Sequence, residues 1–512
     1  MPPTSEPEKY SIDEMMDRLK NRPEEDPLHD GELVTRADGT QAIKVRKRKR
    51  RSHQPHKEMQ KKTRRARMIQ VSGALLLLLM AAFAVGSAIV YSNSAPFREG
   101  VIRMIGATVG AEVRLEEFRV NPSHAVAGRL VLKWPENGIL RDLTIQGASA
   151  SIAPAFFLGK SITGEEVNCA EGTLNLGAPS NLAVPAPSSA TGKPSPIHFK
   201  RYAIQRFNVR TGDPTRPAAS LLESEASFQV DSENGRPQLL LNRGQIQLPG
   251  WPKTKMDRAH IEFRDRDMDI VGMRLLHEND NRGTLELVGT VSPYATDRPS
   301  TLDVRMESFL LSGIAGPELG QLFAGRIDTQ SKVKSNYLAF TPGSEAGATL
   351  AVTFRKALNS SFDLQGFPFL THLALMIGDN WFERPVFENE ANGTLRRQGA
   401  MVALEDLYLE HKARMALRGN LTLAADRQLN GTLEVGITEA MIKSSGHPKL
   451  EAMFGPTDEG FRWLNLKISG NGAKPVDNFL EIVDATRPAK AIPTPEKEKE
   501  VPPTFEDLTA PE

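Results

Sequence analysis

The sequence predicts a mainly β protein that carries a single transmembrane helix near its N-terminus. Two patterns support this fold class. Residues 68–91 form an apolar run of 24 residues without a charged side chain, which is typical of a helix that crosses a bilayer. From Glu112 onward, apolar and polar residues alternate with period two over most of the next ~370 residues, interrupted by Gly, Asn and Asp, and this period is that of β-strands.

The apolar run at 68–91 is long enough to span a membrane, because a helix rises 1.5 Å per residue and about 30 Å of hydrocarbon must be crossed. It is too long and begins too far from Met1 for a cleaved signal peptide. Residues 44–67 hold 13 Lys or Arg against one acid, Glu58, while only Arg98 and Arg103 follow shortly after the run. The positive-inside rule therefore predicts a cytoplasmic N-terminus and a body on the other side of the membrane.

The basic run also has two other interpretations, which are contact with nucleic acid and contact with anionic lipid headgroups. It adjoins the predicted helix and lacks interleaved aromatic residues that would stack on bases. We therefore expect a topology signal, and no specific nucleic-acid partner. Further upstream, residues 11–20 combine capping-box spacing with one apolar helical face. They form either a docking peptide for a cytoplasmic protein partner or a transient helix without one.

The pattern divides the chain into six segments. Residues 1–67 are expected to be cytoplasmic and largely disordered, and 68–91 form the transmembrane helix. Residues 92–176 hold a helix that Pro96 opens and Gly110 ends, followed by the first strands. The Pro-rich segment 177–196 is either a long loop between neighbouring strands or a separator of two lobes, and we favour the loop. The main β body covers 197–484, and 485–512 form a disordered tail.

The clearest alternation marks one apolar strand face. It appears in three segments, whose apolar positions are Leu302, Val304, Met306, Leu433, Val435, Ile437, Leu464, Leu466 and Ile468. Their neighbours in sequence are polar, so each strand is expected to bury one side and expose the other. Strands too extended to close on themselves must cover the apolar face in some way, and acyl chains would serve. A recurring glycine followed by x-Leu-x-Leu or Val, as at Gly419, suggests bends at strand starts.

Residue patterns that carry enzymatic chemistry are missing from the sequence. The ten histidines form no HExxH pair and no metal-spaced cluster. Gly159-Lys160-Ser161 resembles the end of a phosphate loop, but Pro154 stands where the upstream glycine should be. Cys169 is the single cysteine, so an internal disulfide is excluded and a packed small hydrophobe is the favoured interpretation. We therefore expect no enzyme, no metal and no cofactor.

The order of parts resembles that of the AsmA-like family of bacterial envelope proteins. The similar stretches are PFREGVIRMIGATVGAEVRLEEFRV and LRDLTIQGASASIAPAFFLGKSITGEEV after the membrane run, and ALRGNLTLAADRQLNGTLEVGI and WLNLKISGNGAKPVDNF near the end. The resemblance implies an elongated, curved antiparallel sheet with an apolar groove, related in architecture to bridge-like lipid-transfer proteins. It also implies anchoring in the inner membrane, a periplasmic body, and a role in phospholipid transport or outer-membrane assembly. The nine apolar positions above would then line the groove.

Two functions of different classes are compatible with the sequence. In the first, the chain is a non-enzymatic protein that binds or transfers phospholipid between membranes or supports outer-membrane assembly. In the second, it is a structural scaffold that couples a cytoplasmic partner, through residues 11–20 or the basic run, to the envelope. The two differ in whether lipid occupies the apolar face.

Overall fold

The structure is a computed structural model that describes residues 32–44, 54–121, 123–136, 138–153, 162–177, 197–213, 215–230, 235–264, 267–295, 298–330, 336–341 and 347–486. The expected docking peptide at 11–20 and nearly all of the expected segments 177–196 and 485–512 lie outside these residues. The chain forms two compact units, Met1–Phe83 and Ala84–Glu512.

The first unit contains a short hairpin and most of a long helix. The hairpin pairs β1 (Glu32–Thr35) with β2 (Gln41–Lys44), and Gly39 takes a positive φ of 84° in the turn between them. It lies within the segment for which disorder was predicted. Helix α2 (Gln54–Ser92) has 39 residues and begins well before the predicted start at Met68. Lys, Arg and Gln are good helix formers, so the part of the basic run at 54–67 continues the apolar helix toward the N-terminus.

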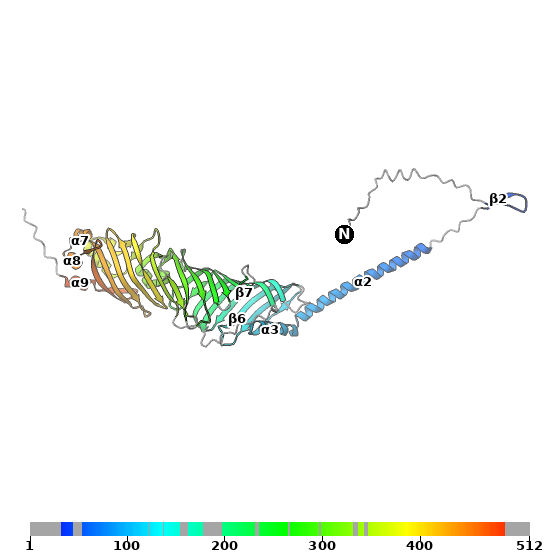
Figure 1. Cartoon of the computed structure of the whole chain (residues 1–512), viewed down its shortest axis with the longest axis horizontal. Helices are drawn as coiled ribbons and strands as arrows, with labels where there is room; N and C mark the ends of the chain where they lie inside the picture. The colour runs from blue at the N-terminus through cyan, green and yellow to red at the C-terminus, as the bar shows by residue number, and fades with distance from the viewer. Residues whose placement is uncertain are drawn as a thin grey trace, which may run out of the picture. The chain divides into compact units, whose positions relative to one another are not determined.

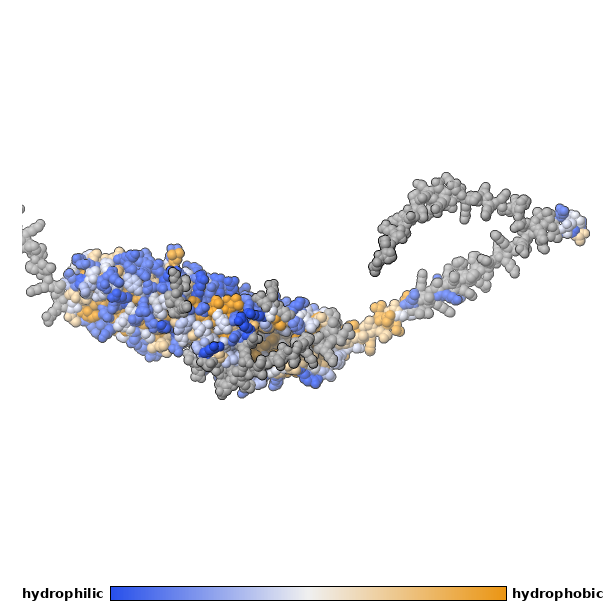
Figure 2. Space-filling view, in the orientation of Figure 1, coloured by the Kyte–Doolittle hydropathy of each residue, from blue (hydrophilic) through white to orange (hydrophobic). Residues whose placement is uncertain are grey.

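The apolar part of α2 confirms the predicted candidate membrane span. Among the described residues, one helix is long and apolar enough to cross a membrane. Its candidate span is the 23-residue segment Gln70–Ser92. Its leucines are exposed, since Leu75 to Leu79 keep 59–68% of their surface. Figure 2 shows the hydrophobic band that these side chains make on α2. Exposure of so many leucines suits a lipid surrounding and would be costly in water.

Helix α3 (Ala95–Val109) confirms the second predicted helix and both of its boundaries. A proline stands in its first turn, and Gly110 ends it in the left-handed conformation with φ 66°. Val101 is buried, and Phe97, Ile102 and Ile105 pack around it with Leu115 and Ala127 of the sheet. The apolar side of α3 therefore covers the beginning of the sheet.

The rest of the second unit is a large, mostly antiparallel sheet, which confirms the mainly β prediction. Its strands are β3 (Glu112–Glu116), β4 (Arg119–Val120), β5 (His124–Lys133), β6 (Leu140–Ser151), β7 (Ile162–Leu176), β8 (Ile197–Asp213), β9 (Arg216–Gln229), β10 (Gln238–Asn242), β11 (Gln245–Gln247), β12 (Thr254–Arg264), β13 (Asp267–His277), β14 (Asp280–Val291), β15 (Ser300–Glu307), β16 (Phe309–Leu310), β17 (Phe323–Thr329), β18 (Tyr337–Phe340), β19 (Thr349–Lys356), β20 (Phe362–Leu364), β21 (Val386–Phe387), β22 (Glu390–Gln398), β23 (Met401–His411), β24 (Met415–Leu423), β25 (Leu429–Thr438), β26 (Thr457–Asp458), β27 (Phe461–Asn471) and β28 (Lys474–Asp477).

Strand pairing follows chain order almost throughout. Pairs run in series from β3 through β5, β6, β7, β8, β9, β12, β13, β14, β15, β19, β22, β23, β24, β25 and β27 to β28. β10 and β11 share the place between β9 and β12, and β18 with β17 fills the place between β15 and β19. In Figure 1 the colours accordingly change in order along the sheet, from cyan beside α3 to orange beside α7, α8 and α9.

One pair of neighbours is parallel, which the predicted meander does not include. β7 and β8 pair over 13 positions, from Ile162 with Ile197 to Leu176 with Thr211. These two strands flank the segment 177–196, so the sheet runs without interruption across that point in the sequence. A parallel connection must return the chain to the same end of the sheet, which requires a long crossover.

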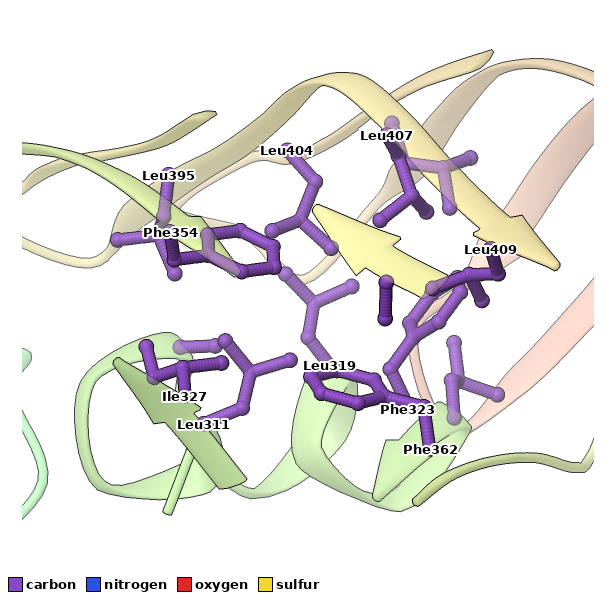
Figure 3. Close-up of a cluster of buried hydrophobic side chains, with 14 of the residues drawn as sticks. Leu311, Leu319, Phe323, Ile327, Phe354, Phe362, Leu395, Leu404, Leu407 and Leu409 are labelled. Atoms are coloured by element: carbon purple, nitrogen blue, oxygen red, sulfur yellow. The ribbon is translucent and has the colours of Figure 1, made fainter. Parts of the chain in front are cut away.

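A set of short elements lies over the second half of the sheet. They are α4 (Ser312–Ala315), α5 (Pro317–Leu322), α6 (Pro368–Ile377), the 3₁₀ turn η2 (Asn380–Glu383), α7 (Glu439–Ser445), α8 (Pro448–Met453) and α9 (Phe479–Ala485). Figure 3 shows how residues of α5, β17, β19, β22 and β23 converge in this core, including Leu319, Phe323, Phe354 and Leu404. All four are 0–1% exposed. The main core of the protein therefore lies in the second half of the sheet.

Candidate functional site

One apolar face continues in register along the sheet. Paired residues on neighbouring strands point to the same face, so the pairings trace its rows. One row joins Leu143, Leu174, Val209, Leu221 and Ile246 from β6 to β11. Another joins Leu241, Ala259, Met273, Leu287 and Val304 from β10 to β15. We call this surface the apolar face.

All nine predicted positions lie on the apolar face, and their alternation is as expected. β15 alternates buried and exposed residues over its whole length, and Leu302, Val304 and Met306 are its buried apolar members. In β25 and β27 the buried members include Leu433, Val435, Ile437, Leu464, Leu466 and Ile468. All nine are at most 6% exposed and belong to the main core. These positions are therefore covered by the protein itself.

The middle of the apolar face is more exposed than its second half. From β8 to β13, many of its residues are only partly buried: Tyr202, Val209, Leu221, Phe228, Leu239, Ile246, Ile261, Phe263 and Met268. Other residues of this face on the same strands, such as Phe207, Leu241 and Ala259, are buried. We call β8–β13 the half-exposed stretch, because apolar side chains there remain partly accessible.

An aromatic row borders the half-exposed stretch. The ring centroids of Phe199, Tyr202, Phe228 and Phe263 follow one another at 6.0, 6.3 and 5.9 Å across β8, β9 and β12. Sequence reasoning missed this row. Phe228 and Phe263 are each the penultimate residue of their strand. An aromatic residue at that position can be seen in the sequence, but only the strand pairing shows that the four rings are neighbours. Such rings supply a large apolar area with little conformational freedom.

The end of α2 and the turn after it contact α3 and the start of the sheet. Tyr91 packs edge-on against Phe97 at 5.7 Å, and Phe97 stacks on Phe118 at 6.5 Å. The side chain of Asn93 donates to the carbonyl of Val120 at 2.8 Å and accepts from the amide of Val120 at 2.9 Å. Within the second unit, the last residues of α2 and the turn after it therefore contact α3 and β4.

Pairs of oppositely charged residues lie on the opposite face of the sheet. Arg418 and Glu434 are cross-strand partners with 2.6 Å between Nε and Oε2, and the Arg418 guanidinium lies 4.1 Å from the Trp463 ring centroid. Arg396 and Glu405 form a similar pair at 2.7 Å. Figure 2 shows a largely hydrophilic surface on the side of the second unit turned to the viewer. Exposed pairs of this kind contribute little to stability, but they make the outer face polar and hydrated.

Cys169 lies on the apolar face, where β7 pairs with β8. It is 3% exposed and faces Ile204 in the register. Burial raises the pKa of its thiol to about 11. The pKa of the neighbouring Tyr202 is also raised, and burial is the largest cause. A neutral thiol in this position behaves as a small apolar side chain. Within the described residues, no group of three or more His, Cys, Asp or Glu is placed to hold a metal ion.

The Cys169 thiol is expected to react with maleimide at pH 7.5 at least about 100 times more slowly in the folded chain than in the unfolded chain. A thiol with a pKa near 11 has about 300-fold less thiolate at that pH than an unperturbed one. Because the pKa is raised, the rate should keep rising with pH up to about 11. The labelling rate is measured by quenching the reaction at set times and quantifying the maleimide adduct by mass spectrometry. A fast rate that levels off near pH 9 would place the thiol in solvent.

Arg397 is the one buried charged side chain among the described residues, at 4% exposure. Its Nε donates to the carbonyl of Gly399 at 3.0 Å, Nη1 to that of Ile314 at 2.6 Å, and Nη2 to that of Gly250. Its guanidinium lies 5.0 Å from the centroid of the Trp251 ring. Burial lowers its pKa to about 10, so it stays charged at neutral pH. It joins three segments that are distant in sequence.

No protein-family model, curated protein or solved structure matches this chain.

Proposed function

We propose that this chain is a membrane-anchored, non-enzymatic protein that binds the acyl chains of phospholipid along the apolar face. The observation that carries the proposal is the half-exposed stretch of the apolar face, in a chain that also holds a candidate membrane span. Apolar area exposed to water costs about 25 cal/mol per Å², so an occupant that covers it is favoured. Acyl chains suit the apolar face, and a polar headgroup would remain at its border.

The half-exposed stretch supports a groove that takes lipid tails. Phe207, Leu241 and Ala259 are buried in it, while Tyr202, Phe228 and Phe263 of the aromatic row are partly accessible. The order of membrane helix, α3 and long sheet also agrees with the AsmA-like resemblance, and we propose membership of that family on this ground. The corresponding role is movement of phospholipid between membranes or support of outer-membrane assembly.

The proposal is tested by photo-crosslinking with a phospholipid that carries a diazirine in one acyl chain. The full-length chain is illuminated in membranes, digested, and its lipid-modified peptides are identified by mass spectrometry. We expect adducts in the half-exposed stretch, for example on the peptides that carry Phe228 and Ile261, in addition to those in α2. Adducts confined to α2 would contradict lipid binding by the body, and the scaffold that couples a cytoplasmic partner to the envelope would take its place.

We also propose that the N-terminus is cytoplasmic, that α2 crosses the inner membrane once, and that the body is periplasmic. Support comes from the basic residues before the apolar segment and the few after it. In cells whose outer membrane has been opened, added protease should digest the body and leave a protected fragment of roughly the first ninety residues. A protected body with a digested N-terminus would show the opposite orientation.

A further inference from the structure

A loop from the first half of the sheet reaches a turn in its second half. Residues 248–253, which we call the strap, connect β11 to β12. In pairing order β22 lies six steps beyond β12, by way of β13, β14, β15, β18 and β19. At about 4.8 Å per step, two strands so placed would be ~29 Å apart along the sheet. Yet the strap contacts the end of β22 and the turn after it.

The contact between the strap and β22 is close. A Cβ added to Gly250 would lie 2.8 Å from the backbone nitrogen of Ala400, so only glycine fits there. Arg397 of β22 bonds the carbonyl of Gly250 and covers the ring of Trp251. The sheet must therefore roll inward between β12 and β22, so that its apolar face turns toward itself.

Arg397 also ties this closure to the core. Its Nη1 bonds the carbonyl of Ile314 at the end of α4, and Ile314 is 2% exposed. Trp251 packs against the main core as well. The strap, Arg397 and α4 together lie where the two parts of the apolar face meet. From β8 to β13 the face keeps partly exposed side chains, whereas from β14 onward Leu287, Leu404 and Leu433 are 0–5% exposed.

We infer that the acyl-chain site is blind-ended: it extends from α3 to the strap and does not continue into the second half of the sheet. This inference rests on the proposed lipid-binding function and limits its extent. The occupant is the tails of a glycerophospholipid from the bilayer that holds α2, because the candidate span ends at Ser92 and the sheet follows it in the chain after the single helix α3. A single chain would then bind a lipid and release it through the same end by which the lipid entered, as a lipid carrier does.

The dimensions agree with this inference. From β8 to β13 there are four strand spacings in pairing order, which correspond to about 19 Å of sheet. One leaflet of a bilayer is about 15 Å of hydrocarbon, half of the ~30 Å core. The half-exposed stretch therefore has room for the tails of one phospholipid without using the second half of the sheet.

The test is photo-leucine incorporation in the full-length chain, because this diazirine analogue is nearly the size of leucine and labels both halves of the face in one experiment. After illumination in phospholipid membranes, lipid adducts are mapped by mass spectrometry. We expect them at Leu221 and Leu239, before the strap, and at least tenfold fewer at Leu404, Leu433 and Leu466, after it. Adducts at comparable frequency in both sets would overturn the blind end while leaving lipid binding intact. Adducts in α2 but in neither set would overturn the proposed function itself.

Discussion

Replacing Leu239 by aspartate is expected to reduce the phospholipid that co-purifies with the chain at least about tenfold, whereas the same change at Leu240 should leave it within twofold. The two leucines are adjacent in β10 and both are partly buried. Leu239 pairs with Phe228 and Ile261 on the apolar face, and Leu240 pairs with Ser227 and His260 on the other face. Burying an unpaired carboxylate beside an acyl chain costs several kcal/mol, and each 1.4 kcal/mol is tenfold in affinity.

The Leu240 variant controls for added charge, because residue type, strand and partial burial are the same. Lipid is extracted from equal amounts of purified full-length protein and quantified by mass spectrometry. Circular dichroism and membrane fractionation verify that both variants are folded and inserted. Lipid bound around α2 contributes equally to both variants, so the difference reports the body. A folded Leu239 variant that retains as much lipid as the parent would contradict binding at the apolar face.

Helices and strand faces could be predicted from the sequence because local chemistry determines them. The uncharged run before Tyr91 has the length that a bilayer requires. Pro96 and Gly110 mark the ends of α3 because each favours a backbone conformation found at that place. Alternation in β15 and β25 shows which side chains share a face, since the period of a strand is two.

What covers the apolar face could not be predicted, because alternation says nothing about the partner of a face. Leu433 and Leu466 were expected to line a groove, yet both are 0% exposed in the core. The elements that cover this half are short, since α4 has 4 residues and α8 has 6. Segments of that length carry too few residues to show a helical period.

The pairing of strands that are distant in the chain could not be predicted from the sequence either. The parallel pairing of β7 with β8 follows from where the chain returns after 177–196, and no local signal reports it. The glycines expected at strand starts lie inside strands instead. A Cβ at Gly419 would lie 2.2 Å from the carbonyl oxygen of Thr432, and one at Gly431 would lie 2.1 Å from that of Asn420. These glycines permit close approach of neighbouring strands, which only the paired sheet reveals.

Replacing Val435 by aspartate is expected to destabilise the folded body by at least about 3 kcal/mol, whether or not lipid is present. Val435 is 1% exposed and pairs with Leu417 and Leu464, so a carboxylate there is buried without a partner. The matched variant is Thr432→Asp. Thr432 is exposed on the opposite face and pairs with Lys467 across the strands, so the new charge gains an opposite neighbour.

Thermal unfolding of the detergent-solubilised chain, followed by circular dichroism, compares the two variants with the parent. Since a domain is stable by only about 5–15 kcal/mol, the Val435 variant should lose much of its stability and become sensitive to protease. Thr432→Asp should change the free energy of unfolding by no more than about 0.5 kcal/mol. If the Val435 variant instead unfolds like the parent, the second half of the apolar face is not a packed core. Lipid could then reach Val435 from the half-exposed stretch, and the blind end at the strap would be wrong.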